Sequence, residues 1–324
     1  MHQSYILGAA ALLLAACTGK LENTREGVRI GLRAGVDEVE VSTRAVASPY
    51  EGTTPSSSNV LDASVWISTT SGAFANSGTP GNLATFPLHT EIQFNSSGLV
   101  YPVSDVLQYP ESKTVYCVGL YPYSASAWTN TDASSAPSNS HASHVINGVD
   151  DLMFAPQVSG TKASPISTPL AFTHQLTWLK INVVAESIDA VTAWGNLTDI
   201  TITSPYDTYT VNLSDGSSSC HGSTTDIIAF RGSQALTIAS QSRGSVFCAP
   251  ANSYNISVTT ANLGTKAVGF VGLKGTDGTT PIADAASAKG RVFVITLSFR
   301  NVNRIDASCT LTAWEDTYQT IEGS

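Results

Sequence analysis

The chain is written as short runs in which apolar and polar residues alternate, and turn signals separate the runs. The clearest runs lie near residues 64–70, 114–121, 170–185, 197–203, 208–213, 255–260, 267–273, 291–299 and 309–314. A period of two places successive side chains on opposite faces of a β-strand. Asn147-Gly148, Asp215-Gly216 and Asp277-Gly278 supply the positive φ angles of tight turns. Residues 283–289 fit a helical turn or two. The pattern predicts an all-β fold of β-sandwiches.

The longest run contains two apolar phases. Phe172, His174 and Leu176 alternate first, and Leu179 and the residues after it then take over the apolar face. A one-residue bulge near Trp178 would join the two phases within one strand. His174, placed between apolar neighbours, is predicted to be a hydrogen-bonded core histidine.

Composition limits the partners. The 324 residues are enough for two domains with real cores, and only 13 % of them are charged. The net charge of −9 would repel a phosphate backbone, so a nucleic-acid partner is not expected.

The first residues resemble a bacterial lipoprotein signal. Residues 5–16 are nearly all apolar, too few to span a bilayer, and end in Leu14-Ala15-Ala16 before Cys17. The resemblance implies that residues 1–16 are a signal peptide and that Cys17 is acylated, which would attach the precursor to the outer membrane through lipid. The alternative is an uncleaved apolar tail that ends in an ordinary cysteine.

Four further cysteines, Cys117, Cys220, Cys248 and Cys309, could pair in three ways in an oxidising compartment. Cys220 and Cys248 flank about one hairpin of chain and are the favoured disulfide. Buried free thiols are the alternative.

An amphipathic strand follows the signal. Five apolar residues alternate with Arg and Gly and share one face: Val28, Ile30, Leu32, Ala34 and Val36. Arg44-Ala45 comes next, before a stretch rich in Pro, Ser and Thr from residue 49 to 58. One interpretation is a lipoprotein tether that happens to form a strand. The other is a lipid-tethered amphipathic strand, within residues 17–44, that lies beside a protease-accessible basic residue.

Two segments give the chain a family resemblance. Asp-Leu-Met-Phe-Ala at 151–155 and Leu-x-Phe-x-His-x-Leu-x-x-Leu from residue 170 resemble the fimbrillins of Bacteroidales type V pili. Trp314 after an alternating strand is also similar. The resemblance implies two tandem transthyretin-like, Greek-key β-sandwich domains, here at 45–188 and 189–324.

The resemblance also implies how the chain works. It would be a stalk or tip pilin of a type V fimbria that serves cell adhesion. An arginine-specific protease would cut between Arg44 and Ala45, and the strand of residues 28–36 would leave a groove. A neighbouring subunit would fill the groove with its residues 309–321, in which Cys309, Leu311 and Ala313 share one face. Its partners would be other fimbrial subunits, in a homo- or hetero-polymer.

Catalytic motifs are missing from the sequence, which contains no G-x-S-x-G, H-E-x-x-H, P-loop or G-x-G-x-x-G pattern. No enzyme activity and no cofactor are predicted. His141-x-x-His144 lies in a Ser/Asn-rich stretch without acidic neighbours, so metal binding is not favoured. The alternative function is a lipid-anchored surface protein that binds glycans, for which Trp128, in a polar segment, is the candidate.

Overall fold

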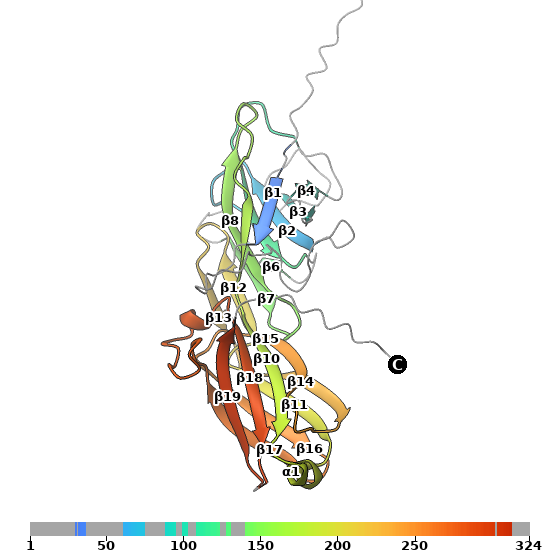
Figure 1. The fold of residues 1–324 in the computed structure, drawn as a ribbon. Helices are drawn as coiled ribbons and strands as arrows, with labels where there is room; N and C mark the ends of the chain where they lie inside the picture. Colours follow the sequence, from blue (N-terminus) through green and yellow to red (C-terminus); the bar gives the residue numbers. More distant parts are fainter. Residues whose placement is uncertain are drawn as a thin grey trace, which may run out of the picture.

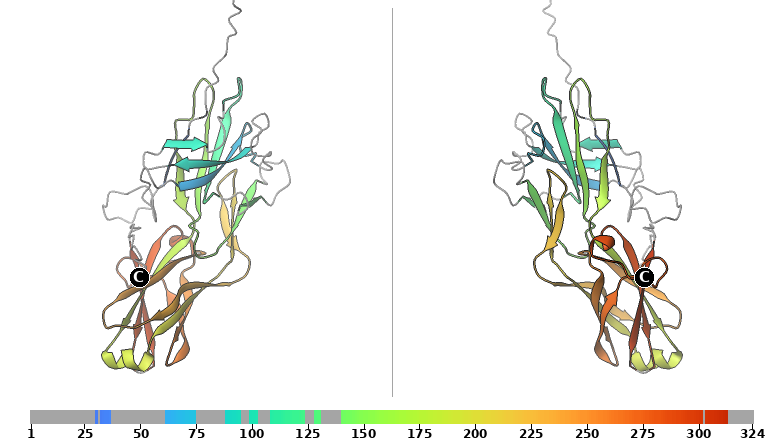
Figure 2. Two further views of the ribbon diagram at one scale, coloured as in Figure 1. Left: turned by 90° about the vertical axis from the view of Figure 1, so that its right-hand side faces the viewer. Right: turned by 90° about the vertical axis from the view of Figure 1, so that its left-hand side faces the viewer.

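The computed structural model describes residues 30, 32–36, 61–74, 88–94, 99–102, 108–123, 128–130, 140–301 and 303–312. Nearly all of its regular structure is strand, which confirms the predicted all-β sandwich class. Figures 1 and 2 show a barrel at one end and a sandwich, with the helix α1 at its tip, at the other.

The first strands form a closed barrel in the order β1-β4-β3-β2-β5-β8-β9. Their bounds are β1 Leu32–Val36, β2 Leu61–Ser68, β3 Leu88–Phe94, β4 Leu99–Pro102, β5 Val115–Tyr121, β8 Met153–Gly160 and β9 Leu170–His174. Alternate side chains of these strands fill the interior, as the period of two requires. The interior residues form a core of their own, which includes Val65, Cys117 and Phe172.

A small sheet covers one outer face of the barrel. Its order is β13-β12-β7-β6, with β6 Thr129–Asn130, β7 His141–Val145, β12 Thr208–Asn212 and β13 Ser218–His221. The outward residues Trp66 and Leu120 belong to one core cluster with Ala142 and Val211 of this sheet. The β12–β13 hairpin comes from the part of the chain after residue 189, yet β12 pairs with β7. The division at 188 and 189 remains a prediction.

Two four-stranded sheets make the sandwich, in the orders β15-β10-β18-β19 and β14-β11-β16-β17. The first contains β10 Thr177–Ala185, β15 Gln241–Cys248, β18 Val292–Phe299 and β19 Ile305–Thr312. The second contains β11 Leu197–Ser204, β14 Thr225–Gln234, β16 Ser253–Thr260 and β17 Gly264–Gly272. The inner faces share one core, to which Ile181 and Ile295 of the first sheet and Ile202 and Val258 of the second belong.

The long run at 170–185 is two strands, so the predicted bulge near Trp178 is wrong. β9 ends at His174 in the barrel, and β10 begins at Thr177 in the sandwich. The change of apolar phase occurs because the chain leaves one sheet and enters another. Gln175 and Leu176, which join the strands, are both buried.

Helical structure differs from the expectation. The segment near 283–289 contains only the short 3-10 helix η2 Ala286–Ala288, whereas the α-helix α1 Ile188–Trp194 was not predicted. Ser187 caps α1 by accepting a hydrogen bond from the Ala190 N–H, 3.1 Å away. Seven residues of mixed propensity carry too weak a helical signal to be recognised from sequence.

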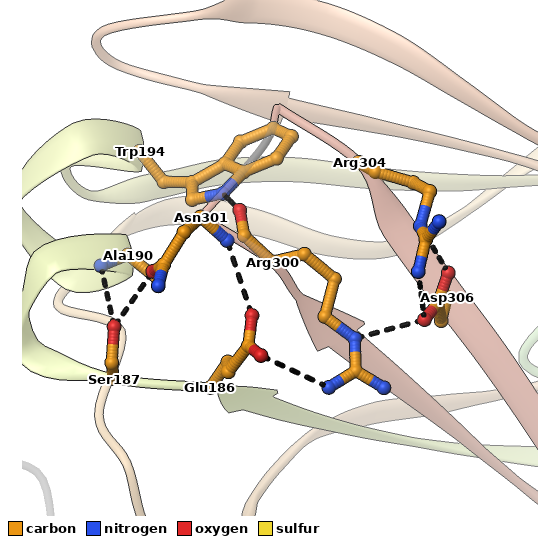
Figure 3. Close-up of polar contacts among 8 residues, drawn as sticks. All are labelled: Glu186, Ser187, Ala190, Trp194, Arg300, Asn301, Arg304 and Asp306. Atoms are coloured by element: carbon orange, nitrogen blue, oxygen red, sulfur yellow. Dashed lines mark hydrogen bonds and ion pairs between the residues drawn. The ribbon is translucent and has the colours of Figure 1, made fainter.

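The β18–β19 turn anchors α1 (Figure 3). The Trp194 indole N–H donates to the Arg300 carbonyl oxygen at 2.8 Å, and the Ser187 hydroxyl donates to the Asn301 side chain at 2.7 Å. Asp306 accepts from the Arg300 Nε at 2.8 Å and also contacts Arg304. Hydrogen bonds and ion pairs with Arg300 and Arg304 lower the pKa of the Asp306 carboxyl. Polar contacts therefore hold this end of the sandwich.

Candidate site for strand exchange

The strand β1 closes the barrel. It pairs antiparallel with β4, where Leu32 faces Val100, and parallel with β9, where Val36 faces Phe172. Figure 1 shows β1, in blue, lying against the barrel wall. Both edges of β1 are therefore occupied, and without it β4 and β9 would each be an edge strand.

Ile30, two residues before β1, and Leu32, the first residue of β1, both point into the barrel. Ile30 is 4 % exposed and Leu32 is 5 % exposed, and both belong to the barrel core together with Ile92 and Leu170. Of the five residues on the predicted face, Ile30 and Leu32 are the two whose side chains the structure describes. Ala34 and Val36 lie in β1, and Val28 lies outside the described residues.

The barrel makes room for the aromatic side chain beside β1. Gly119 in β5 has no side chain, and a Cβ atom there would lie 2.6 Å from the Phe172 ring and 3.2 Å from Ala155. Phe172 is completely buried and comes from the strand that pairs with β1. The interior beneath β1 is thus packed by matched large and small residues.

Removal of β1 would cost the barrel much of its stability. Burial of a Leu or Ile side chain contributes roughly 1.5–3 kcal/mol, so Ile30 and Leu32 together contribute about 3–6 kcal/mol. A whole domain is stable by only ~5–15 kcal/mol. The open edges of β4 and β9 would expose unpaired backbone groups that can template another strand. Without β1, the edges of β4 and β9 could therefore pair with another extended apolar strand.

The predicted donor residues are part of this chain's own sandwich. Cys309 pairs with Ile295 and is 2 % exposed, and Leu311 pairs with Phe293 and is 8 % exposed. Both belong to the large core cluster. They do share one face, but that face is covered by their own subunit. Ala313, like Cys17, Arg44 and Ala45, lies outside the described residues.

The cysteines are buried or half-buried. Cys117, Cys220, Cys248 and Cys309 are free thiols, so the favoured disulfide between Cys220 and Cys248 is not formed here and stays a prediction. Burial raises the pKa of Cys220 and of Cys309 to about 11. Burial, with smaller contributions from the Cys248 and Cys220 thiols, raises the pKa of the Tyr254 phenol, so both thiols influence the same residue.

A buried polar pair at the end of β9 was predicted only in part. His174 is 3 % exposed and its Nδ1 lies 2.7 Å from Asp151 Oδ2, which confirms the prediction of a hydrogen-bonded core histidine. Asp151, expected to face solvent or cap a turn, is instead its partner. Gln175 follows, and its side-chain oxygen accepts from the buried Tyr209 hydroxyl at 3.0 Å. These contacts tie the barrel to the small sheet and the sandwich.

Trp128 is a core residue, which contradicts its prediction as an exposed glycan-binding residue. Its side chain is 5 % exposed, and its indole N–H donates to the Pro122 carbonyl oxygen at 2.8 Å. Its ring meets His144 and Tyr209 edge-on. The polar neighbours of Trp128 in the sequence hid this burial, because the small sheet supplies its apolar contacts from distant segments.

The described part of the chain contains neither a metal-binding cluster nor a membrane-spanning helix. No group of three or more His, Cys, Asp or Glu side chains there could hold a metal ion. Within the same residues, no helix has the length and apolar character needed to span a membrane.

The barrel, the small sheet and the sandwich define an all-β protein. The fimbrillin-like family model matches residues 43–314, and the chain belongs to this family. Family membership makes it a structural protein of the fimbrial, cell-surface type. The matched range begins just before Arg44, so β1 lies outside it.

Solved structures show the same fold. A "putative cell adhesion protein" from Bacteroides uniformis has 17 % identity and a TM-score of 0.53, with 89 % of this chain and 98 % of that chain covered. Another so described, from Bacteroides ovatus, has 14 % identity and a TM-score of 0.55, with 90 % and 99 % covered. No curated protein matches this chain.

Proposed function

We propose that this protein is a stalk or tip subunit of a type V fimbria, assembled by donor-strand exchange and serving cell adhesion. The observation that carries the proposal is the position of β1, which pairs on both edges and closes the barrel although it precedes the family-matched range. A protease that cuts between Arg44 and Ala45 would separate β1 from the rest of the subunit. The precursor would reach the outer membrane through a lipid on Cys17.

The incoming strand would come from the C-terminal part of a neighbour. Because Cys309 and Leu311 hold β19 on β18 in the subunit's own core, their donation would require β19 to leave its sheet. We infer that exchange begins with the residues that follow Thr312, Ala313 first. The incoming strand would pair with β4 and β9 and replace the apolar face of Ile30 and Leu32.

Limited cleavage tests the proposal. The delipidated precursor should stay monomeric, and the same protein cut after Arg44 by a trypsin-like protease should polymerise, as measured by light scattering. Arg44→Gln should block both the cut and polymerisation. Arg231→Gln, a change at an exposed arginine of β14, should behave like the unchanged chain. Polymers from uncut Arg44→Gln protein, or a cut protein that stays monomeric, would overturn the proposal.

Trp128, the candidate residue for glycan binding, is buried and therefore does not support that alternative. Of the other tryptophans, Trp66 and Trp194 are also buried and Trp178 is stacked on Phe247. No contact among the described residues favours that alternative over strand exchange.

A further inference from the structure

One row of side chains crosses the outer face of the sheet β15-β10-β18-β19. Phe247 pairs with Trp178, Trp178 with Val292, and Val292 with Thr312. Residues directly opposite one another on paired strands point to the same face of a sheet. The neighbouring Phe293 points into the sandwich core, so this row points away from it.

The outer face is covered at Val292, whereas Trp178 and Phe247 are half-buried. Val292 is 1 % exposed, yet it belongs to neither core cluster. Beside it, the Trp178 and Phe247 rings stack with centroids 5.5 Å apart and an interplanar angle of 22°. The Lys180 ammonium lies 4.1 Å from the centroid of the Trp178 ring. The surface formed by Trp178, Lys180, Phe247 and Val292, here termed the aromatic row, combines flat apolar area with one positive charge.

We propose that the C-terminal residues 313–316 of the same subunit dock on the aromatic row before assembly. β19 ends at Thr312, in the row itself. Trp178 lies two strands away in the sheet order, about 10 Å at the usual strand spacing. An extended residue spans up to about 3.5 Å, so two to four residues beyond Thr312 reach it. Residues 313–316 are therefore long enough to connect the end of β19 with Trp178.

The chemistry of the two partners matches. The sequence after Thr312 is Ala-Trp-Glu-Asp, which places Trp314 among the first residues that can reach the row. A third aromatic ring extends the stack of Trp178 and Phe247. Glu315 and Asp316 supply negative charges to Lys180.

The docked segment would act as a latch on donation. The docking itself does not depend on strand exchange and goes beyond the proposed function. If exchange takes place, residues held on their own sheet cannot at the same time fill a neighbour's barrel. Release from the aromatic row would then precede assembly.

A zero-length carbodiimide cross-link tests the contact in the whole, uncut subunit at low concentration. Lys180 should become linked to Glu315 or Asp316 within one molecule, as read by mass spectrometry. Lys180→Glu should abolish this link, and Lys266→Glu, on the other sheet, should leave it unchanged. Absence of the link, or a link only between molecules, which would indicate a second copy on this face, overturns the proposal.

Carboxypeptidase provides a second measurement. In Trp178→Ala and in Lys180→Glu, Trp314 should be released about tenfold faster, equal to about 1.4 kcal/mol of lost docking free energy. Phe270→Ala, at an 81 % exposed residue of β17, and Lys266→Glu should release it at the original rate. Reversal of Glu315 and Asp316 to Lys should restore slow release in Lys180→Glu. Equal rates in all folded variants overturn the proposal, and thermal melts identify the folded ones.

Discussion

At the scale of single residues, buried polar groups of this protein form hydrogen bonds with residues that are distant in the sequence. His174 alternates with apolar neighbours, so its burial could be predicted from period two alone. Its partner Asp151 could not, because the contact exists only where β9 returns beside β8. The same holds for Gln175 and Tyr209, which are 34 positions apart. A buried polar residue can thus be predicted from the alternation around it, whereas its partner depends on which strands pair.

His89 should make the barrel sensitive to acid. Its ring stacks on Trp66 with centroids 4.1 Å apart, and its Nε2 has no hydrogen-bond partner among the described residues. Burial lowers the pKa of His89 from 6.5 to about 4. The unfolded chain therefore binds a proton between these values while the folded chain does not, so stability falls as the pH drops from 6.5 to 4.

The size of this loss is up to about 3 kcal/mol for a shift of this kind. Thermal melts of the unchanged protein and of His89→Phe, at pH 7 and pH 4.5, check it. Phe keeps an aromatic ring on Trp66 but cannot titrate, so its melting temperature should fall less on acidification. An equal fall in both proteins would show that His89 is not the group responsible.

At the scale of elements, strand existence was predictable and strand partnership was not. The runs near 114–121, 197–203 and 291–299 correspond to β5, β11 and β18 within a residue or two. β13 and β14 lack a clear apolar alternation because much of each is exposed, and they were not predicted. The break between β9 and β10 could not be told from a bulge, since both shift the apolar phase.

The removable strand can be tested as an element. Ile30→Asp with Leu32→Asp places two charges in the barrel core, at a cost of several kcal/mol. The precursor should melt at a much lower temperature than the unchanged precursor. After cleavage behind Arg44 and removal of the cut segment, the two proteins are identical in sequence and should melt alike. Arg33→Asp, at the residue that follows Leu32 in β1, is the matched charge control for the precursor.

Equal destabilisation of the variant before and after cleavage would mean that this strand stays with the subunit. A precursor unaffected by both aspartates would contradict the burial of Ile30 and Leu32 on which the site depends. Melting of the precursor therefore tests whether Ile30 and Leu32 are part of the barrel core, and melting after cleavage tests whether the strand is removed from the subunit.

At the scale of the whole molecule, the two ends of the chain have complementary roles in the proposed assembly. The N-terminal strand occupies a place in the barrel, and the C-terminal strand β19 forms the edge of a sandwich sheet from which the last residues continue. The resemblance in sequence indicated both roles. It could not indicate that Cys309 and Leu311 are already committed to the subunit's own core, because that depends on the pairing of β19 with β18.

Two C-terminal deletions distinguish the donor from the scaffold. Removal of residues 313–324 leaves β19 in place, so the subunit should still fold, and its melting temperature should fall only by the small contribution of the docked residues 313–316. Removal of residues 309–324 also takes away Cys309 and Leu311, and the melting temperature should fall because two buried side chains leave the sandwich core.

The shorter deletion is the informative one for assembly. After cleavage behind Arg44, subunits that lack residues 313–324 can accept a strand but have none to donate. Alone they should stay monomeric in light scattering. Mixed with whole cleaved subunits, they should occupy growing ends and shorten the polymers in proportion to their share of the mixture. If they polymerise alone as well as whole subunits do, the donor lies elsewhere in the chain. If the mixture shows full-length polymers, the truncated subunits do not accept a strand, and the groove left by β1 is not the acceptor.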